Sequence, residues 1–81
     1  MNNKFRIVDI HPQDAFYPNR DDLIGILLEN VTFGYINLVP GMSRWCGLTA
    51  TLLDDIHYMD SIIPKGSTAI FLAVQVEPVY D

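Results

Sequence analysis

The sequence contains a single cysteine, Cys46, among 81 residues, so an intramolecular disulfide and a cysteine-based zinc framework are both excluded. Cations are also scarce, because five Lys and Arg stand against ten Asp and Glu and the formal net charge is −5. Contacts to nucleic-acid phosphates or to an anionic membrane need Lys and Arg clustered on one face. Here they are scattered along the chain, at Lys4, Arg6, Arg20, Arg44 and Lys65. We therefore expect no nucleic-acid partner and no membrane partner.

Long apolar runs are missing as well. None approaches the roughly 20 residues that a membrane-spanning helix needs, and the first residues are not followed by the apolar core of a signal peptide. A glycine-rich phosphate loop is also absent, since the five glycines stand singly. With the unpaired thiol, these absences predict a cytoplasmic protein, and we expect no cofactor.

The composition is nevertheless apolar, with 49% hydrophobic and only 19% charged residues. The chain is too apolar to be disordered, and its length allows only one domain, which we place over residues 1–81. So few charged residues leave some apolar side chains on the surface of such a small domain. Because contiguous exposed apolar area usually marks an interface, we expect a protein partner or self-association.

Alternation of apolar and polar residues predicts an all-β chain. The five expected strands cover residues 4–10, 23–28, 31–39, 45–53 and 67–79. A helix over 23–39 is the weaker interpretation, because two glycines and several β-branched residues lower the helical propensity of that window.

Two segments between the strands are less regular. Residues 11–22 hold two prolines and three aspartates, which predicts a long ordered loop anchored by Phe16 and Tyr17. Residues 54–66 fit either a short helical turn or an irregular loop, since Ile56 and Met59 have helical spacing. The sequence leaves that choice open.

The segment FRIVDIHPQDAFYPNRDDLIG resembles small SH3-like barrel proteins of bacteriophages and their bacterial hosts. In those proteins a first strand is followed by a P-x-D-A-aromatic-Tyr loop and by an Ile-Gly that enters the second strand. The matching residues here are Pro12, Asp14, Ala15, Phe16, Tyr17, Ile24 and Gly25. The ending AIFLAVQVEPV is similar to the final strand of the same group.

The resemblance implies a fold and a biological setting but no activity. The implied fold is a small SH3-like barrel of about five strands with long loops and at most one short helical turn. The implied setting is a host cell, in which the chain acts as an accessory protein of a phage or mobile element. SH3-like barrels serve many unrelated roles, so no catalytic residue follows from the fold.

Two His-x-x-Asp pairs are the strongest candidates for metal chemistry. They are His11 with Asp14 and His57 with Asp60, and if they met they would offer oxygen and nitrogen ligands to a divalent ion. We favour the alternative that these aspartates bond their own backbone in loops. We also expect Cys46 to be a small buried apolar residue and not a nucleophile, since no oxyanion site accompanies it.

The aromatic residues of the loops are more informative. In peptide-binding SH3 domains, aromatic grooves bind proline-rich ligands while an acidic loop binds a basic ligand residue. By this reasoning the partner-binding residues are Asp14, Phe16, Tyr17, Asp21, Asp22, Trp45 and Tyr58. Core packing is the alternative for Phe16 and Trp45, because so small a barrel needs large side chains to fill its interior.

Three functions therefore stand as hypotheses. The first is a non-enzymatic interaction module, including an inhibitor of a host defence enzyme whose basic channel attracts an acidic protein. The second is a self-assembling structural component of a phage-like particle. The third is a metal-dependent enzyme that uses the His-x-x-Asp pairs.

Overall fold

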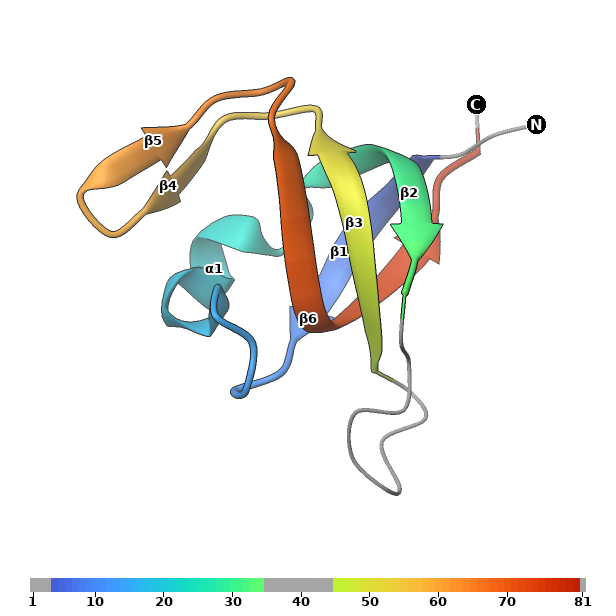
Figure 1. Cartoon of the computed structure of the whole chain (residues 1–81), viewed down its shortest axis with the longest axis horizontal. Helices are drawn as coiled ribbons and strands as arrows, with labels where there is room; N and C mark the ends of the chain where they lie inside the picture. Colours follow the sequence, from blue (N-terminus) through green and yellow to red (C-terminus); the bar gives the residue numbers. More distant parts are fainter. Residues whose placement is uncertain (1–3, 35–44, 81) are drawn as a thin grey trace.

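The computed structural model describes residues 4–34 and 45–80 of the chain (Figure 1). The strands, in chain order, are β1 (Lys4–Ile10), β2 (Leu27–Phe33), β3 (Cys46–Leu52), β4 (Ile56–Tyr58), β5 (Ser61–Ile63) and β6 (Thr68–Pro78). Two short helical segments lie between β1 and β2: the 3-10 helix η1 (Tyr17–Asn19) and the helix α1 (Arg20–Leu23).

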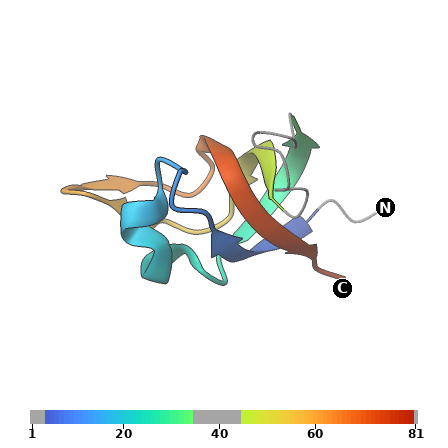
Figure 2. The same cartoon turned by 90° about the horizontal axis from the view of Figure 1, so that it is seen from below.

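Four of the strands form a closed antiparallel barrel in the order β1-β2-β3-β6. The long strand β6 closes it, because its first part pairs with β3 and its second part pairs with β1. Strands β4 and β5 form a separate hairpin between β3 and β6, which extends from the barrel on the same side as α1 (Figures 1 and 2). The expected fold class, a small all-β barrel, is confirmed, and η1 runs directly into the one short α-helix of the described residues.

One hydrophobic core fills the barrel and continues under α1 and β4. Its buried residues are Ile7, Ile10, Leu23, Leu28, Val31, Leu48, Ala50, Leu52, Ile56, Ala69, Phe71 and Val74. Burial of a Leu, Ile or Phe side chain stabilises a fold by roughly 1.5–3 kcal/mol, so this cluster supplies most of the stabilising free energy.

Bulges change which residues of a strand point inward. Simple alternation places Ile7 and Ile10 on opposite faces of β1, yet both are buried, because the register shifts between Ile7 and Asp9. The register of β3 against β6 also shifts, between Cys46 and Leu48. As a result Val74 is buried, although alternation places it on the same face as the exposed Leu72.

The expected strands 4–10, 45–53 and 67–79 are present as β1, β3 and β6. The expected pair 23–28 and 31–39 is instead the single strand β2, with residues 35–39 outside the described ranges. Its interruption is a bulge at Asn30, which has a left-handed φ of 53° that asparagine tolerates better than most residues. The chain therefore continues through Asn30 as one strand and does not form a turn between two strands there.

Two loop predictions are corrected. The loop over 11–22 contains η1 and the start of α1, and it ends in a turn at Gly25, whose φ of 93° suits glycine. The segment 54–66 is neither a helical turn nor an irregular loop, since it forms the β4–β5 hairpin. Its two-residue turn contains Met59 at a φ of 56°.

Candidate protein-binding surface

Asp14 fastens the loop after β1 to the barrel. One carboxylate oxygen, Oδ1, accepts a hydrogen bond from the backbone N–H of Phe16 at 2.9 Å. The other, Oδ2, accepts from the N–H groups of Leu72 and Ala73 in β6 at 2.8 and 2.9 Å. With only 3% of its surface exposed, Asp14 holds the loop and does not face a partner, which corrects its assignment to the partner-binding set.

The backbone of the loop is ordered by its own hydrogen bonds. The N–H of His11 donates to the carbonyl of Ala73 at 2.9 Å, which continues the contact between the loop and β6. Within the loop, Asp14 donates to His11, and Tyr17 donates to Asp14. These hydrogen bonds anchor the start of the segment that follows, from Tyr17 onward.

Phe16 and Tyr58 join this loop to the β4–β5 hairpin. The ring centroid of Phe16 lies 4.9 Å from that of the buried Phe71 and 5.0 Å from that of Tyr58. The Tyr58 hydroxyl donates to the carbonyl of Ala15 at 3.2 Å. Phe16 therefore packs against the core, as the alternative in the sequence analysis had it, and Tyr58 is half-buried with its hydroxyl paired.

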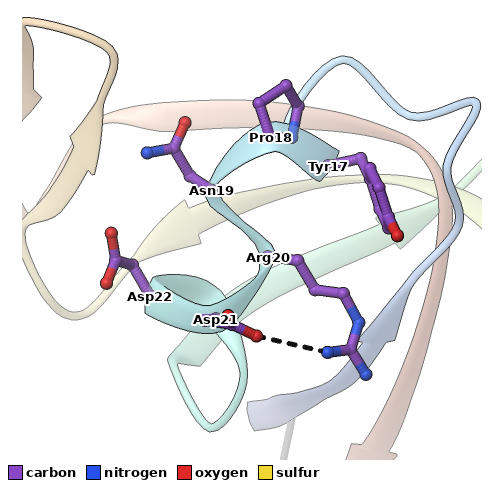
Figure 3. A pocket seen from close by; sticks show the side chains of 6 residues that line it. All are labelled: Tyr17, Pro18, Asn19, Arg20, Asp21 and Asp22. Carbon is purple, nitrogen blue, oxygen red and sulfur yellow. Dashed lines mark hydrogen bonds and ion pairs between the residues drawn. The ribbon is translucent and has the colours of Figure 1, made fainter.

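Three of the expected binding residues belong to the lining of one open hollow of about 490 Å³. In Figure 3 the side chains of Tyr17 and Asp22 point to opposite sides of the segment, and Asp21 points toward Arg20. Tyr17, Asp21 and Asp22 are all exposed, and the Asp21 side chain is 98% accessible. The complete lining is Tyr17, Pro18, Asn19, Arg20, Asp21 and Asp22. An aromatic ring, a proline and two exposed carboxylates thus line one surface on η1 and α1, where Asp21 also contacts Arg20.

Arg20 is a part of this hollow that the sequence analysis missed. Its Nε donates to Oδ1 of Asp9 at 2.8 Å, and its guanidinium lies 3.4 Å from Oδ1 of Asp21. The hydrogen bond and charge of Asp9 raise the pKa of Arg20 above its ordinary range. Arg20 is thus shared between Asp9 of β1 and Asp21, and two carboxylates against one guanidinium leave the lining of the hollow with an acidic surplus.

Trp45 lies outside the hollow, immediately before β3. Its ring meets that of His11 edge to face, with 5.1 Å between centroids. The Nδ1 atom of His11 accepts a hydrogen bond from the backbone N–H of Gln13 at 3.1 Å. Trp45 is half-buried and supports the first turn of the loop, while its expected contact with a partner stays a prediction.

The groups considered for metal or thiol chemistry are not assembled into a site. Within residues 4–34 and 45–80, no three His, Cys, Asp or Glu side chains are grouped so as to hold a metal ion. The thiol of Cys46 donates to the carbonyl of Val74 at 3.3 Å, and burial raises its pKa. It therefore stays protonated at neutral pH and is a poor nucleophile.

The same two ranges contain no helix long and apolar enough to cross a bilayer. Comparison of the chain with models of protein families, with curated proteins and with solved structures found no match. The resemblance to phage SH3-like barrel proteins therefore stays a prediction, and the function is inferred from the chain's own residues.

Proposed function

We propose that the chain is a non-enzymatic interaction module that binds a basic segment of a partner protein in the hollow between Tyr17 and Asp22. The observation that carries the proposal is one concave surface lined by an exposed ring, a proline and two exposed carboxylates, of which Asp21 also contacts Arg20. The stem of a Lys or Arg packs against Tyr17 and Pro18. Its charged end then faces Asp21 and Asp22.

The free energy of each contact determines how strongly this surface binds a partner. An exposed ion pair contributes only about 0.2–1 kcal/mol, so the two carboxylates by themselves give weak binding. Their larger effect is on encounter, since a charge of −5 draws a basic surface toward the chain and orients it. The attraction is screened beyond roughly 8 Å at physiological salt. Binding is therefore salt-dependent, and the aromatic contact supplies its specificity.

Rigidity of the support favours binding further. The Asp14 carboxylate and the backbone hydrogen bonds of residues 11–19 fix the segment before a ligand arrives. A preorganised surface loses less conformational entropy on association than a mobile one. The function we infer for Asp14 is thus to position the surface.

A partner with a basic channel fits the acidity of this surface. Within the setting implied by the resemblance, that partner is a host enzyme, such as a defence enzyme, and the chain is its inhibitor. The host-enzyme role depends on the resemblance, whereas binding of a basic segment depends on the hollow alone.

Binding of a labelled proline- and arginine-containing peptide, followed by fluorescence anisotropy, tests the proposal. The double variant Asp21→Asn/Asp22→Asn should weaken binding at least about tenfold, which corresponds to about 1.4 kcal/mol. The control is Asp54→Asn/Asp60→Asn, which makes the same change in net charge at two exposed residues outside the hollow. Equal losses in both double variants would show non-specific attraction and reject the hollow as the site.

The alternative function, a self-assembling structural component of a phage-like particle, is favoured by large apolar side chains that remain exposed on the barrel, such as Ile70 and Leu72. Such a component forms a closed ring of defined mass, which light scattering would detect. No observation on the described residues favours the metal-dependent enzyme.

A further inference from the structure

Arg20 makes two contacts of unequal strength, and the stronger one is to the barrel. Its Nε donates to Oδ1 of Asp9 at 2.8 Å, and the same oxygen accepts the backbone N–H of Ile10 at 2.9 Å. Both side chains of the ion pair are partly buried, so water competes only in part for it. Because Asp9 belongs to β1, this contact fastens the start of α1 to the barrel.

The second contact of Arg20 is longer and lies in solvent. Its Nη1 is 3.4 Å from Oδ1 of Asp21, whose side chain is 98% exposed. Attraction between two exposed charges is weak. The pKa of Arg20 is raised chiefly by the hydrogen bond and charge of Asp9 and less by the charge of Asp21, which ranks the two contacts in the same order. Arg20 can therefore leave Asp21 while it stays bound to Asp9.

Figure 3 shows where the weaker contact lies in the hollow. The Asp21 side chain points toward Arg20, and the guanidinium lies on the same side of the segment as the Tyr17 ring, whereas Asp22 points to the other side. A basic side chain that packs against Tyr17 therefore approaches Asp21 from the side that Arg20 occupies. The carboxylate that this ligand would meet is already paired.

We propose that Arg20 is an internal competitor for Asp21, which occupies the carboxylate that a basic residue of the partner binds. The partner displaces Arg20 from Asp21 but not from Asp9, so the attachment of α1 to β1 is kept during binding. The competition rests on the proposed function, because it concerns the same basic segment in the same hollow.

The competition affects which segments bind. A ligand with a single cation exchanges one exposed ion pair at Asp21 for another, so its affinity rises little from that contact. A ligand that also packs against Tyr17 and Pro18, or that reaches Asp22, has contacts for which Arg20 does not compete. The hollow therefore discriminates against isolated basic residues and selects segments in which a cation adjoins an apolar or a second basic residue.

The variant Arg20→Gln tests the competition in the anisotropy titration with the proline- and arginine-containing peptide. Loss of one competing exposed ion pair should raise peptide affinity about two- to fivefold. The matched control is Arg6→Gln, which makes the same change in net charge at an arginine of β1 that is paired with Glu77 outside the hollow. Arg6→Gln should leave the affinity almost unchanged, because salt screens distant charges.

A double-mutant cycle shows whether Arg20 acts through Asp21. In the Asp21→Asn background the contested carboxylate is absent, so Arg20→Gln should no longer raise the affinity. In the Asp22→Asn background, which has the same net charge, the gain should persist. Equal gains in both backgrounds would show that Arg20 only repels the peptide at long range, and would overturn the competition. Any loosening of α1 by Arg20→Gln affects both backgrounds alike, so the difference between them still decides.

Asp9→Asn tests the competition in the opposite direction. Loss of the Asp9 charge weakens the stronger contact of Arg20 and leaves the guanidinium to Asp21, so peptide affinity should fall about twofold. The matched control is Glu77→Gln, which removes the carboxylate of the Arg6 pair and should change affinity less. A rise in affinity on Asp9→Asn would contradict the competition.

The competition and the binding site fail in different ways. Absence of peptide binding by the unaltered chain, or equal losses in Asp21→Asn/Asp22→Asn and its control, rejects the hollow and the competition together. Peptide binding at the hollow with the same affinity in Arg20→Gln and Arg6→Gln rejects the competition alone. The expected result is binding at the hollow that strengthens only in Arg20→Gln.

Discussion

The barrel and the structure at its side are held in different ways. We call the loop 11–19, α1 and the β4–β5 hairpin the side lobe. The barrel strands are joined by backbone ladders on both edges and enclose most of the core. The side lobe contributes two of the twelve buried core residues, Leu23 and Ile56, and packs the partly buried Phe16 and Ile63 against the core. Its other attachments are single contacts such as the Asp14 carboxylate.

The side lobe can open locally more easily than the barrel. A distributed core loses stability everywhere when any part is removed, whereas a lobe held by single contacts can open while the barrel stays folded. The hollow lined by Tyr17 to Asp22 is on the lobe. Local opening of the lobe therefore abolishes this candidate binding surface while the barrel stays folded.

The largest effect is expected from the barrel core. Leu28→Ala removes a fully buried side chain of β2 and should lower the free energy of unfolding by about 2–5 kcal/mol. Chemical denaturation measures the loss, and hydrogen exchange should accelerate in the barrel and in the lobe together. Leu72→Ala, the same substitution on the exposed side of β6, is the control and should cost less than about 1 kcal/mol. If Leu28→Ala accelerated exchange in the lobe alone, the barrel would not be the common support.

The next effect separates the two regions. Asp14→Asn replaces a carboxylate oxygen with an amide that cannot accept, and should lower stability by about 1–3 kcal/mol through unpaired N–H groups. Exchange of the Phe16, Leu72 and Ala73 amides should accelerate, while amides shared by β1 and β2 keep their protection. The control is Asp55→Asn, which removes one exposed carboxylate bond to the N–H of Lys65. Uniform acceleration across the barrel would refute separate opening of the lobe.

A third substitution should strengthen the lobe. Met59 has a φ of 56° at the tip of the hairpin, a left-handed conformation that strains most residues other than glycine. Its side chain is 75% exposed, so little packing is lost when it is removed. Met59→Gly should raise stability by about 0.5–1 kcal/mol in thermal unfolding, because it relieves that strain. Met59→Ala keeps the strain, and an equal gain in both variants would point to the side chain instead.

The barrel was predictable from the sequence to a greater extent than the lobe. Strands β1, β3 and β6 follow from two-residue alternation, which is a local property of the chain. The hairpin was missed because Met59 and Asp60 lack the Asn-Gly type of turn that marks hairpins, and because Ile56 and Met59 have helical spacing. Tertiary packing of Ile56 decides in favour of strands there.

In the candidate surface, too, contacts within one short segment could be predicted from the sequence, whereas contacts between distant segments could not. Tyr17, Asp21 and Asp22 belong to one short segment, so their proximity could be predicted from the sequence. The role of Asp14 could not, since its partner Leu72 lies 58 positions further along the chain. The pairing of Arg20 with Asp9 likewise depends on how the loop returns to β1.

The smallest effect concerns the contact between hairpin and loop. Tyr58→Phe removes the hydroxyl that donates to the carbonyl of Ala15 but keeps the ring beside Phe16. We expect a loss of about 0.5–1 kcal/mol, confined to faster exchange of amides in η1 and the hairpin. Tyr80→Phe, at a highly exposed residue near the C-terminus, is the control and should change nothing. Peptide affinity at the hollow should fall in proportion to the fraction of molecules in which the side lobe is open. If affinity were lost without faster exchange, Tyr58 would contact the partner directly.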